Sequence, residues 1–196
     1  MKILILGKSL SAIAPIIRKY GDEVLEWEDS LEVHFVRENQ IDFVISYGYR
    51  HIIRSSIIDC FPNCIINLHI SYLPWNRGAD PNLWSFLEDT PKGISIHFVD
   101  EGIDTGDIIV QREVNFSGEG ETLFTTYQKL QDEMIQLFKS YWPKIRAGQC
   151  PRQKQATGGT FHKTSDRKRI EPLLVKGWDT SVDLLKGKAL HEKSVH

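Results

Sequence analysis

The sequence predicts an α/β fold built on a mostly parallel sheet, and the prediction rests mainly on its first half. Short apolar runs, with the length of buried strands, alternate there with segments whose apolar residues recur at helical spacing. The connections between them are short, as they are in doubly wound sheets. At 196 residues, the chain is long enough for one such domain with a substantial core and an appended segment.

The first elements are expected in the order strand, helix, strand, helix, strand. Residues 3–6 form an apolar run typical of a strand buried on both faces, and Ser9 is expected to cap the next helix. The apolar face of that helix consists of Leu10, Ile13, Ile17 and Tyr20. We then expect a strand at 23–27, a helix at 30–39 and a strand at 41–46.

The second half contains fewer but longer signals. The Asp80-Pro81 pair predicts a helix start, because Asp caps helices and Pro suits the first helical position. Strands expected at 94–99 and 108–114 are too close in sequence for a helical crossover, so we expect them to be antiparallel neighbours. A helical period from 122 to 145 predicts a long helix that lies along the sheet.

The composition changes near residue 148. The segment from Lys144 to Arg169 holds eight Lys or Arg residues and a single acid, Asp166. We therefore divide the chain into a main domain at 1–148 and a C-terminal extension at 149–196 that packs on or near it. The basic residues either face solvent or contact a ligand phosphate or another subunit.

Charge and composition argue against several classes of protein. A formal net charge of −2 gives no general attraction to nucleic acid or to a membrane surface, so we expect neither as a partner. The sequence has no run of about 18 apolar residues and no visible signal peptide, which predicts a cytoplasmic protein. The cysteines lack a zinc-binding spacing, so we expect reduced thiols and no metal site. They are Cys60, Cys64 and Cys150.

Polar side chains follow two of the expected strands where each strand ends. An Asn-x-His-x-Ser group starts at Asn67, directly after an apolar run at 64–66, and an Asp-Thr-Gly turn starts at Asp104. Open α/β sheets bind ligands at the carboxyl ends of their strands, so Asn67, His69 and Asp104 are expected to converge. Each alone is more often structural. Together, an amide, an imidazole and a carboxylate suit acyl transfer.

This ordered set resembles the folate-dependent formyltransferases, whose members carry Asn-x-His, then Leu-Pro and a glycine, and later an Asp-(Thr/Gly)-Gly turn. The matching residues, within a stretch from about Tyr47 to Val114, are Asn67, His69, Leu73-Pro74, Gly78 and Asp104-Thr105-Gly106. The resemblance implies a Rossmann-like three-layer fold, with residues 1–148 as the catalytic domain, and 10-formyltetrahydrofolate as formyl donor. It also implies that Asn67 and His69 stabilise a tetrahedral intermediate while Asp104 assists proton transfer.

The resemblance further implies where the two substrates bind. The pterin of the donor is expected between two loops that contain Gly48, Tyr49, Ile52, Ile53, Val99, Asp100 and Gly102. The alternative for the first loop is a glycine turn with two core isoleucines. The residues expected to line the site or contact the amine substrate are Ser71, Arg77, Trp84 and His97. As alternatives, His97 is a core histidine bonded to backbone, and Arg77 faces solvent.

Local resemblances to some formyltransferases, and the absence of motifs typical of others, limit the class of amine acceptor that we expect. The run from Arg77 to Trp84 resembles the Arg-Gly-x-x-Pro-x-x-Trp run of sugar-amine formyltransferases. The segment from Thr160 to Lys163 resembles the segment that follows the core domain of the same enzymes. Residues 7–11 lack the Gly-x-Gly-Ser-Asn phosphate loop of glycinamide ribonucleotide enzymes. Too few residues follow the long helix for the further domain of methionyl-tRNA enzymes, and a strand-helix unit is expected to be missing or abbreviated before Asn67.

We therefore expect formyl transfer to the primary amine of a small molecule, most specifically a nucleotide-linked amino sugar. The alternatives are a glycinamide ribonucleotide formyltransferase, a formyltetrahydrofolate hydrolase, and a non-catalytic folate-binding module. A homodimer is one open alternative for the assembly state.

Overall fold

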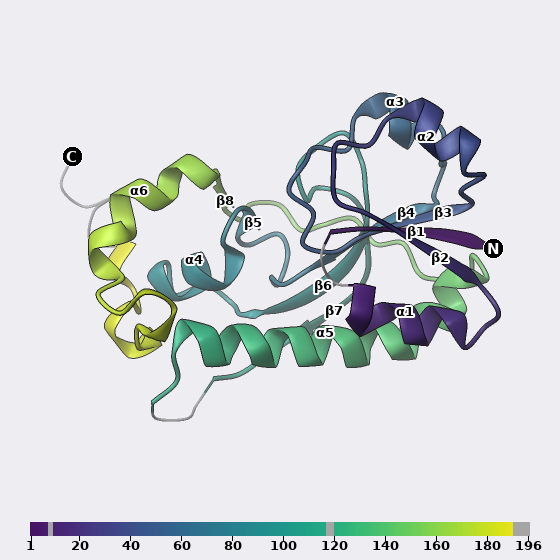
Figure 1. Cartoon of the computed structure of the whole chain (residues 1–196). Coiled ribbons are helices and arrows are strands. Elements are labelled where there is room, and N and C mark those ends of the chain that lie inside the picture. The colour runs from purple at the N-terminus through teal and green to yellow at the C-terminus, as the bar shows by residue number, and fades with distance from the viewer. Residues whose placement is uncertain (8–9, 117–119, 190–196) are drawn as a thin grey trace. The chain divides into compact units, whose positions relative to one another are not determined.

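Six strands form one sheet, in the order β2-β1-β3-β4-β6-β7, in a computed structural model that describes residues 1–7, 10–116 and 120–189 (Figure 1). They are β1 (Lys2–Leu6), β2 (Glu23–Trp27), β3 (Phe43–Ser46), β4 (Ile65–His69), β6 (Gly93–Phe98) and β7 (Ile108–Glu113). β1 pairs in parallel with β2 and β3, and β3 with β4. Hydrogen bonds from Phe98 N to Asp107 O and from Val114 N to Lys92 O make β6 and β7 antiparallel. The predicted mostly parallel sheet is confirmed.

The helices include the long one that the sequence predicts. They are α1 (Leu10–Arg18), α2 (Val33–Glu38), α3 (Ser55–Ile58), α4 (Pro81–Leu87), α5 (Leu123–Arg146) and α6 (Arg167–Ile170). The helix expected at 30–39 is shorter, and α3 was not expected because four residues are too few to show a helical period. Tyr20, expected on the apolar face of α1, lies beyond its end and is 40% exposed. The expected Ser9 cap lies outside the described residues.

Contacts divide the chain into two compact units, and each is described by itself. The first comprises residues 1–69, 96–110 and 135–155, and the second comprises 70–95, 111–134 and the chain from 156 onward. β6, β7 and α5 each contribute residues to both units. The division into 1–148 and 149–196 concerns folding domains and stays a prediction.

In the first unit, helices cover both faces of the strands (Figure 1). α2 and α3 lie over a buried cluster on one face that includes Leu4, Leu6, Val36, Val44, Ile57 and Ile65. α1 and the C-terminal half of α5 lie on the other face, where Phe43 packs edge-on against Trp142 at 5.7 Å. Successive strand residues face opposite sides of a sheet, so strands covered on both sides are apolar throughout. The predicted three-layer arrangement is confirmed here.

The second unit is built around α4 and a two-stranded parallel sheet of β5 (Arg77–Gly78) and β8 (Phe161–His162). Short 3-10 turns complete it: η1 (Thr164–Asp166), η2 (Glu171–Leu173), η3 (Gly177–Asp179) and η4 (Val182–Leu184). Ile170, Val182 and Leu185 are at most 5% exposed and belong to one buried cluster with the apolar residues of α4. The C-terminal segment therefore supplies core residues as well as charge.

The start of α4 corrects one prediction. Pro81 begins the helix as expected, and Asp80 occupies the capping position. However, Asp80 has a φ of 50° and makes no side-chain capping hydrogen bond. Its carboxylate instead lies 3.6 Å from Arg167 Nη1, so the predicted cap is wrong because an ion pair takes the side chain.

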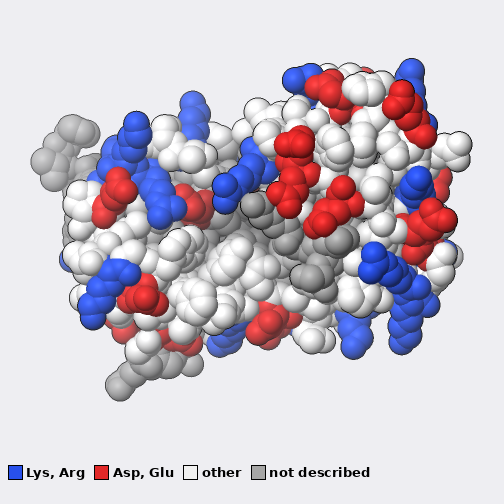
Figure 2. All heavy atoms as spheres, viewed as in Figure 1, with Lys and Arg blue, Asp and Glu red and all other residues white. Residues whose placement is uncertain are grey.

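The surface over the C-terminal segment is basic. Figure 2 shows Lys and Arg side chains gathered over the α6 region, and Lys163, Lys168 and Arg169 are exposed. These three residues thus face solvent, while a contact with phosphate or another subunit stays a prediction. Among the described helices, none combines the length and apolar character needed to cross a membrane.

Candidate active site

The Asp104 carboxylate is the centre of a polar cluster in the first unit. Asn67 Nδ2 donates a hydrogen bond to Asp104 Oδ1 at 2.9 Å. His69 Nδ1 lies 3.6 Å from Asp104 Oδ2, and His97 Nε2 lies 3.4 Å from Asp104 Oδ1. The side chains of His69, His97 and Asp104 are 8%, 2% and 11% exposed. The structure thus brings together the three residues expected to converge and places His97, which was expected to line the site, beside them.

A hydrogen bond to the backbone shows which nitrogen of the His97 ring carries a proton. Its Nδ1 lies 2.8 Å from the carbonyl oxygen of Phe98, and a carbonyl can only accept, so Nδ1 carries a proton. In the neutral ring Nε2 is then an acceptor, and Asn67 Nδ2 donates to it at 3.3 Å. His97 is therefore both bonded to backbone and in contact with the cluster, which unites the two alternatives derived from the sequence.

The strands explain why these side chains meet. Asn67 and His69 are two residues apart on β4, so both side chains project from the same face of the strand. His97 lies on β6, which is the neighbour of β4 in the sheet. The rings of His69 and His97 meet edge to face, with centroids 6.3 Å apart.

The loop after β6 sets the direction of the Asp104 side chain. Asp104 has a φ of 54°, in the left-handed region that residues other than glycine rarely adopt. Thr105 Oγ1 donates to Asp100 Oδ1 at 2.6 Å and closes the loop on itself. A Cβ at Gly106 would lie 1.8 Å from Phe98 O, so only glycine allows the chain to pass there.

Residues predicted to hold the pterin occupy two segments of the first unit. Gly48 has a φ of 68°, and Ile52 is 73% exposed, so the alternative of a core isoleucine is wrong for Ile52. Ile53, Tyr49 and Val99 pack against one buried cluster. Burial raises the pKa of the Tyr49 hydroxyl, which stays protonated at neutral pH.

The other segment contains Asp100 and Gly102. Asp100 Oδ1 accepts a hydrogen bond from Gly102 N at 3.1 Å. A Cβ on Gly102 would lie 2.0 Å from Thr105 Oγ1, so this turn leaves no room for a side chain. Contact of either segment with folate stays a prediction.

The residues predicted to meet the amine substrate belong to the second unit. Ser71 Oγ donates to the carbonyl oxygen of Trp75, and Arg77 Nη2 reaches the carbonyl oxygen of Gly158 at 3.5 Å. Trp84 is 3% exposed and stacks on His162, with centroids 3.9 Å apart and planes 3° apart. This is the environment of a packing residue. Substrate contact by Ser71, Arg77 and Trp84 stays a prediction.

Sequence patterns missed one residue that contacts the Asp104 loop. Gln155 Nε2 donates to the carbonyl oxygens of Asp104 and Gly106. A single glutamine in a basic segment carries no local signal of such a contact, because the partners lie about fifty residues earlier in the chain.

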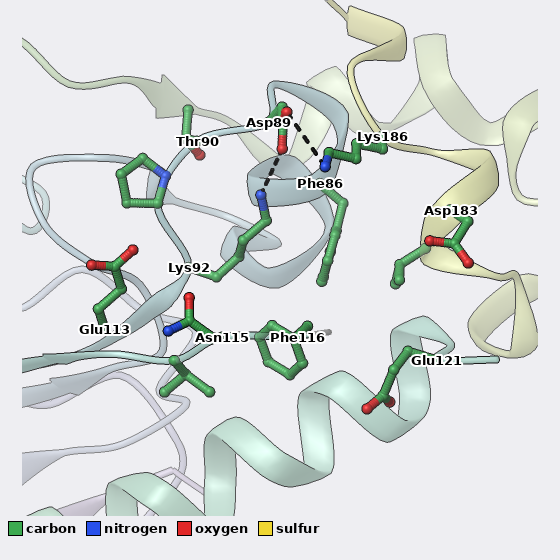
Figure 3. A pocket seen from close by; sticks show the side chains of 13 residues that line it. Phe86, Asp89, Thr90, Lys92, Glu113, Asn115, Phe116, Glu121, Asp183 and Lys186 are labelled. Carbon is green, nitrogen blue, oxygen red and sulfur yellow. Dashed lines mark hydrogen bonds and ion pairs between the residues drawn. The ribbon is translucent and has the colours of Figure 1, made fainter. Parts of the chain in front are cut away.

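A cavity of about 390 Å³ in the second unit has a different character (Figure 3). The rings of Phe86 and Phe116 meet edge to face there, 5.6 Å apart. Lys92 Nζ lies 5.3 Å from the Phe86 ring centroid and 3.0 Å from Asp89 Oδ1, and Lys186 Nζ lies 3.9 Å from Asp89. Its described lining includes none of the predicted site residues, and its lysines are matched by the protein's own groups.

Comparison with known proteins agrees with the chemistry of the Asp104 cluster. A model of the formyl transferase family matches residues 23–140, which is more than half of the chain and includes Asn67, His69, His97 and Asp104. The chain belongs to the formyl transferase family. The family and the α/β formyltransferase fold expected from the sequence are thereby confirmed.

Solved structures of related formyltransferases extend over almost the whole chain. The formyltransferase PseJ from Anoxybacillus kamchatkensis is 50% identical and aligns with 96% of this chain and 100% of its own, with a TM-score of 0.92. A 4-N formyltransferase from Francisella tularensis is 22% identical, covers 95% and 87% of the two chains and has a TM-score of 0.79, which shows a shared fold.

Two methionyl-tRNA formyltransferases are less similar to this chain than PseJ is, and both are longer than this chain. A methionyl-tRNA formyltransferase from Fusobacterium nucleatum is 34% identical over 145 residues, which are 74% of this chain. The matched region spans only 46% of the length of that relative, and 26% of the length of a methionyl-tRNA formyltransferase from Finegoldia magna.

Proposed function

We propose that this protein transfers a formyl group from 10-formyltetrahydrofolate to the primary amine of a nucleotide-linked amino sugar. The observation that carries the proposal is one carboxylate, on Asp104, shared by Asn67, His69 and His97 at the ends of two strands. Similarity to PseJ supports the acceptor class, since that enzyme was crystallised with UDP-4,6-dideoxy-4-formamido-L-AltNAc and tetrahydrofolate.

The formyl donor supplies an acyl carbon bonded to a nitrogen leaving group. We assign its pterin to the segments 48–53 and 99–102 of the first unit. The exposed Ile52 side chain offers an apolar contact, and Gly48 permits close approach of the backbone to a ligand. These features fit a flat, partly apolar ring that bonds to backbone groups.

Asn67 and His69 are suited to stabilise the oxyanion that forms on the formyl oxygen during attack by the amine. Donors placed in advance at such an oxygen typically contribute about 10²–10³ in kcat. Asn67 can offer the N–H that faces His97 Nε2 at 3.3 Å, the longer of its two contacts. His69 turns Nδ1 towards Asp104. With a proton on both nitrogens, the ring faces the carboxylate with Nδ1 and donates to the oxyanion from Nε2, on its opposite side.

Asp104 is the base in this proposal. The attacking nitrogen becomes cationic and must lose a proton before the bond from the formyl carbon to the folate nitrogen breaks. Asp104 accepts that proton, directly or through one water, and returns it to the folate nitrogen as the bond to the formyl carbon breaks and tetrahydrofolate forms. The 2.9 Å hydrogen bond from Asn67 holds the Asp104 carboxylate at the end of the sheet.

A panel of acceptors tests the proposal. Purified protein is incubated with 10-formyltetrahydrofolate and nucleotide-linked amino sugars, the corresponding free amino sugars, glycinamide ribonucleotide or methionyl-tRNA. Mass spectrometry then measures the gain of one formyl group, with the Asp104→Asn variant, which should be at least about a hundredfold slower, as the control. We expect efficient transfer to one or more nucleotide-linked sugars.

Three results would contradict the proposal in different ways. Transfer to glycinamide ribonucleotide alone would assign a different acceptor. Equal rates with free and nucleotide-linked sugars would remove the nucleotide from recognition. Formate released without any acceptor would make the protein a hydrolase.

A further inference from the structure

We propose that Gln155 is a positioning residue of the active site, which holds the Asp104–Gly106 turn so that the Asp104 carboxylate faces Asn67 and His69. The inference rests on the proposed role of Asp104. All of the contacts that carry it lie within the first unit.

The Gln155 amide spans the turn. Its Nε2 donates to the carbonyl oxygen of Asp104 at 2.8 Å and to that of Gly106 at 2.9 Å. A primary amide nitrogen has two hydrogens, and this side chain donates both of them to the same turn. The two bonds fix the Asp104–Thr105 and Gly106–Asp107 peptide units, and thereby the direction in which the Asp104 side chain leaves the chain.

The turn needs such support because its backbone is unusual. Asp104 is held at a φ of 54°, a conformation that persists in non-glycine residues only when surrounding contacts impose it. Its carboxylate must meet three partners at once, and two of those contacts, to His69 and His97, are 3.6 and 3.4 Å long. Small rotations of the turn would therefore change which partner the carboxylate faces.

Gln155 is itself anchored by the residues before it, 152–154, which we call the strap. Gln153 and Ile108 exchange backbone hydrogen bonds of 2.9 and 2.7 Å in an antiparallel bridge. Arg152 Nε donates to Asp107 Oδ2 at 2.7 Å, and this guanidinium holds the pKa of the Asp107 carboxyl below its usual range. The strap thus fixes the glutamine from one side while its amide fixes the turn from the other.

The other end of the amide indicates what the side chain is for. Gln155 Oε1 is buried and has no hydrogen-bond partner among the described residues. A buried acceptor without a partner is unfavourable, so filling space alone would be better done by an apolar side chain of similar size. The two Nε2 bonds to the turn are the feature that an apolar residue cannot supply.

The first test replaces the amide without changing its bulk. Gln155→Met is compared with Gln153→Met, a matched change at an exposed position whose bridge uses only main-chain atoms. With the full-length protein, 10-formyltetrahydrofolate and the best acceptor of the panel, we expect Gln155→Met to lower kcat by about tenfold to a hundredfold. Both KM values should stay within about threefold, and Gln153→Met should match the wild type.

A double variant separates positioning from a general effect on folding. If Gln155 acts through Asp104, then Asp104→Asn with Gln155→Met should be no slower than Asp104→Asn alone. Hydrogen exchange of peptides covering 100–107 should be faster in Gln155→Met, with peptides of β1 and β3 unchanged. This exchange readout does not depend on activity.

A conservative variant gives a second kinetic signature. In Gln155→Glu, a carboxylate faces two carbonyl oxygens, and only its protonated form can donate a hydrogen bond to one of them. The ratio of its kcat to that of the wild type should therefore rise as the pH falls, whereas the ratio for Gln155→Met should stay flat.

The outcomes distinguish this inference from the proposed function. Wild-type kcat and unchanged exchange in Gln155→Met, beside an inactive Asp104→Asn, would overturn the role of Gln155 alone. An active Asp104→Asn would overturn both. A slow Gln155→Met whose effect multiplies with that of Asp104→Asn would show that the glutamine does not act through Asp104.

Discussion

Within the part of the chain that the structure describes, two groupings of histidine and carboxylate occur, one in each unit, and both are buried. In the second unit His162 Nε2 lies 3.2 Å from Glu88 Oε2, and the two side chains are 8% and 5% exposed. In the first unit His69 and His97 share Asp104, and exposure there is between 2% and 11%. Burial therefore cannot tell which grouping carries chemistry.

The arrangement of the partners does distinguish them. The His162 ring is closed on one face by Trp84 and belongs to β8, beside the buried cluster of α4. Asp104 instead lies on a loop at the ends of strands, with contacts of 2.9, 3.4 and 3.6 Å to three different residues. A close pair behind an aromatic ring is suited to hold elements together. A carboxylate beside an amide donor and two imidazole rings is suited to exchange a proton.

The largest expected effect is on stability, and it concerns the second unit. Glu88→Ala leaves a buried histidine without its carboxylate and should lower the free energy of unfolding by about 3–5 kcal/mol. Urea titration measures the loss, and kcat per folded molecule should change by less than about threefold.

A double replacement sharpens this expectation. Glu88→Met with His162→Phe keeps the ring on Trp84 and removes both polar groups, so it should be more stable than Glu88→Ala alone. A Glu88 variant that folds normally but has lost activity would show that the two groupings are not divided as described.

The next effect is on rate, and it concerns the first unit. Asp104→Asn keeps the shape of the side chain but removes the base, so kcat should fall by at least about a hundredfold, with Tm changed little. His69→Ala should fall as far because the oxyanion loses a donor. The assay follows tetrahydrofolate production at saturating donor, and His69→Ala with more than about a tenth of wild-type activity would disprove the assignment.

A smaller effect comes from a buried carboxylate of the first unit that takes no part in the chemistry. Arg146, and next the N-terminal amine, hold the pKa of Asp22 below its ordinary value, with contacts of 2.6, 2.8 and 2.9 Å. A lowered folded-state pKa means that this stabilisation is present above the unfolded pKa and is lost as the pH falls through the folded value. Asp22→Asn should lower Tm at pH 7 by on the order of 5 °C.

Thermal melts across pH check the sign of that effect. The difference in Tm between wild type and Asp22→Asn should be constant near neutrality and shrink below about pH 4. A difference that grew as the pH fell would contradict the ion pair. Activity at 25 °C should be unaffected, which separates structural carboxylates of this unit from Asp104.

The last prediction is that removing metal ions has no effect on the rate of formyl transfer. The Asp104 side chain contacts amide and imidazole nitrogens directly, and we assign proton transfer and oxyanion stabilisation to these groups alone. Prolonged treatment with a chelator should therefore leave formyl transfer unchanged. Activity lost on chelation and restored by one divalent ion would require a different chemistry for the cluster.

Local pattern explains what could be predicted. Strand and helix periods depend on neighbouring residues, so the sheet, α5 and the strand ends that carry Asn67 and Asp104 follow from the sequence. The short α3 and the two-residue β5 and β8 were missed, because elements of two to four residues contain no full period. The Asp80 cap was wrong because a distant cation, Arg167, competes for the carboxylate.

The sequence by itself determined the fold class, the family and the three residues that meet at the end of the sheet, because each depends on the order and type of nearby residues. Only the tertiary structure decided which histidine is closed off by an aromatic ring and which glutamine holds the Asp104 turn. Those contacts join residues 74 positions apart for Glu88 and His162, and 51 apart for Asp104 and Gln155. Side chains so distant in sequence become neighbours only when packing of the whole chain places them together.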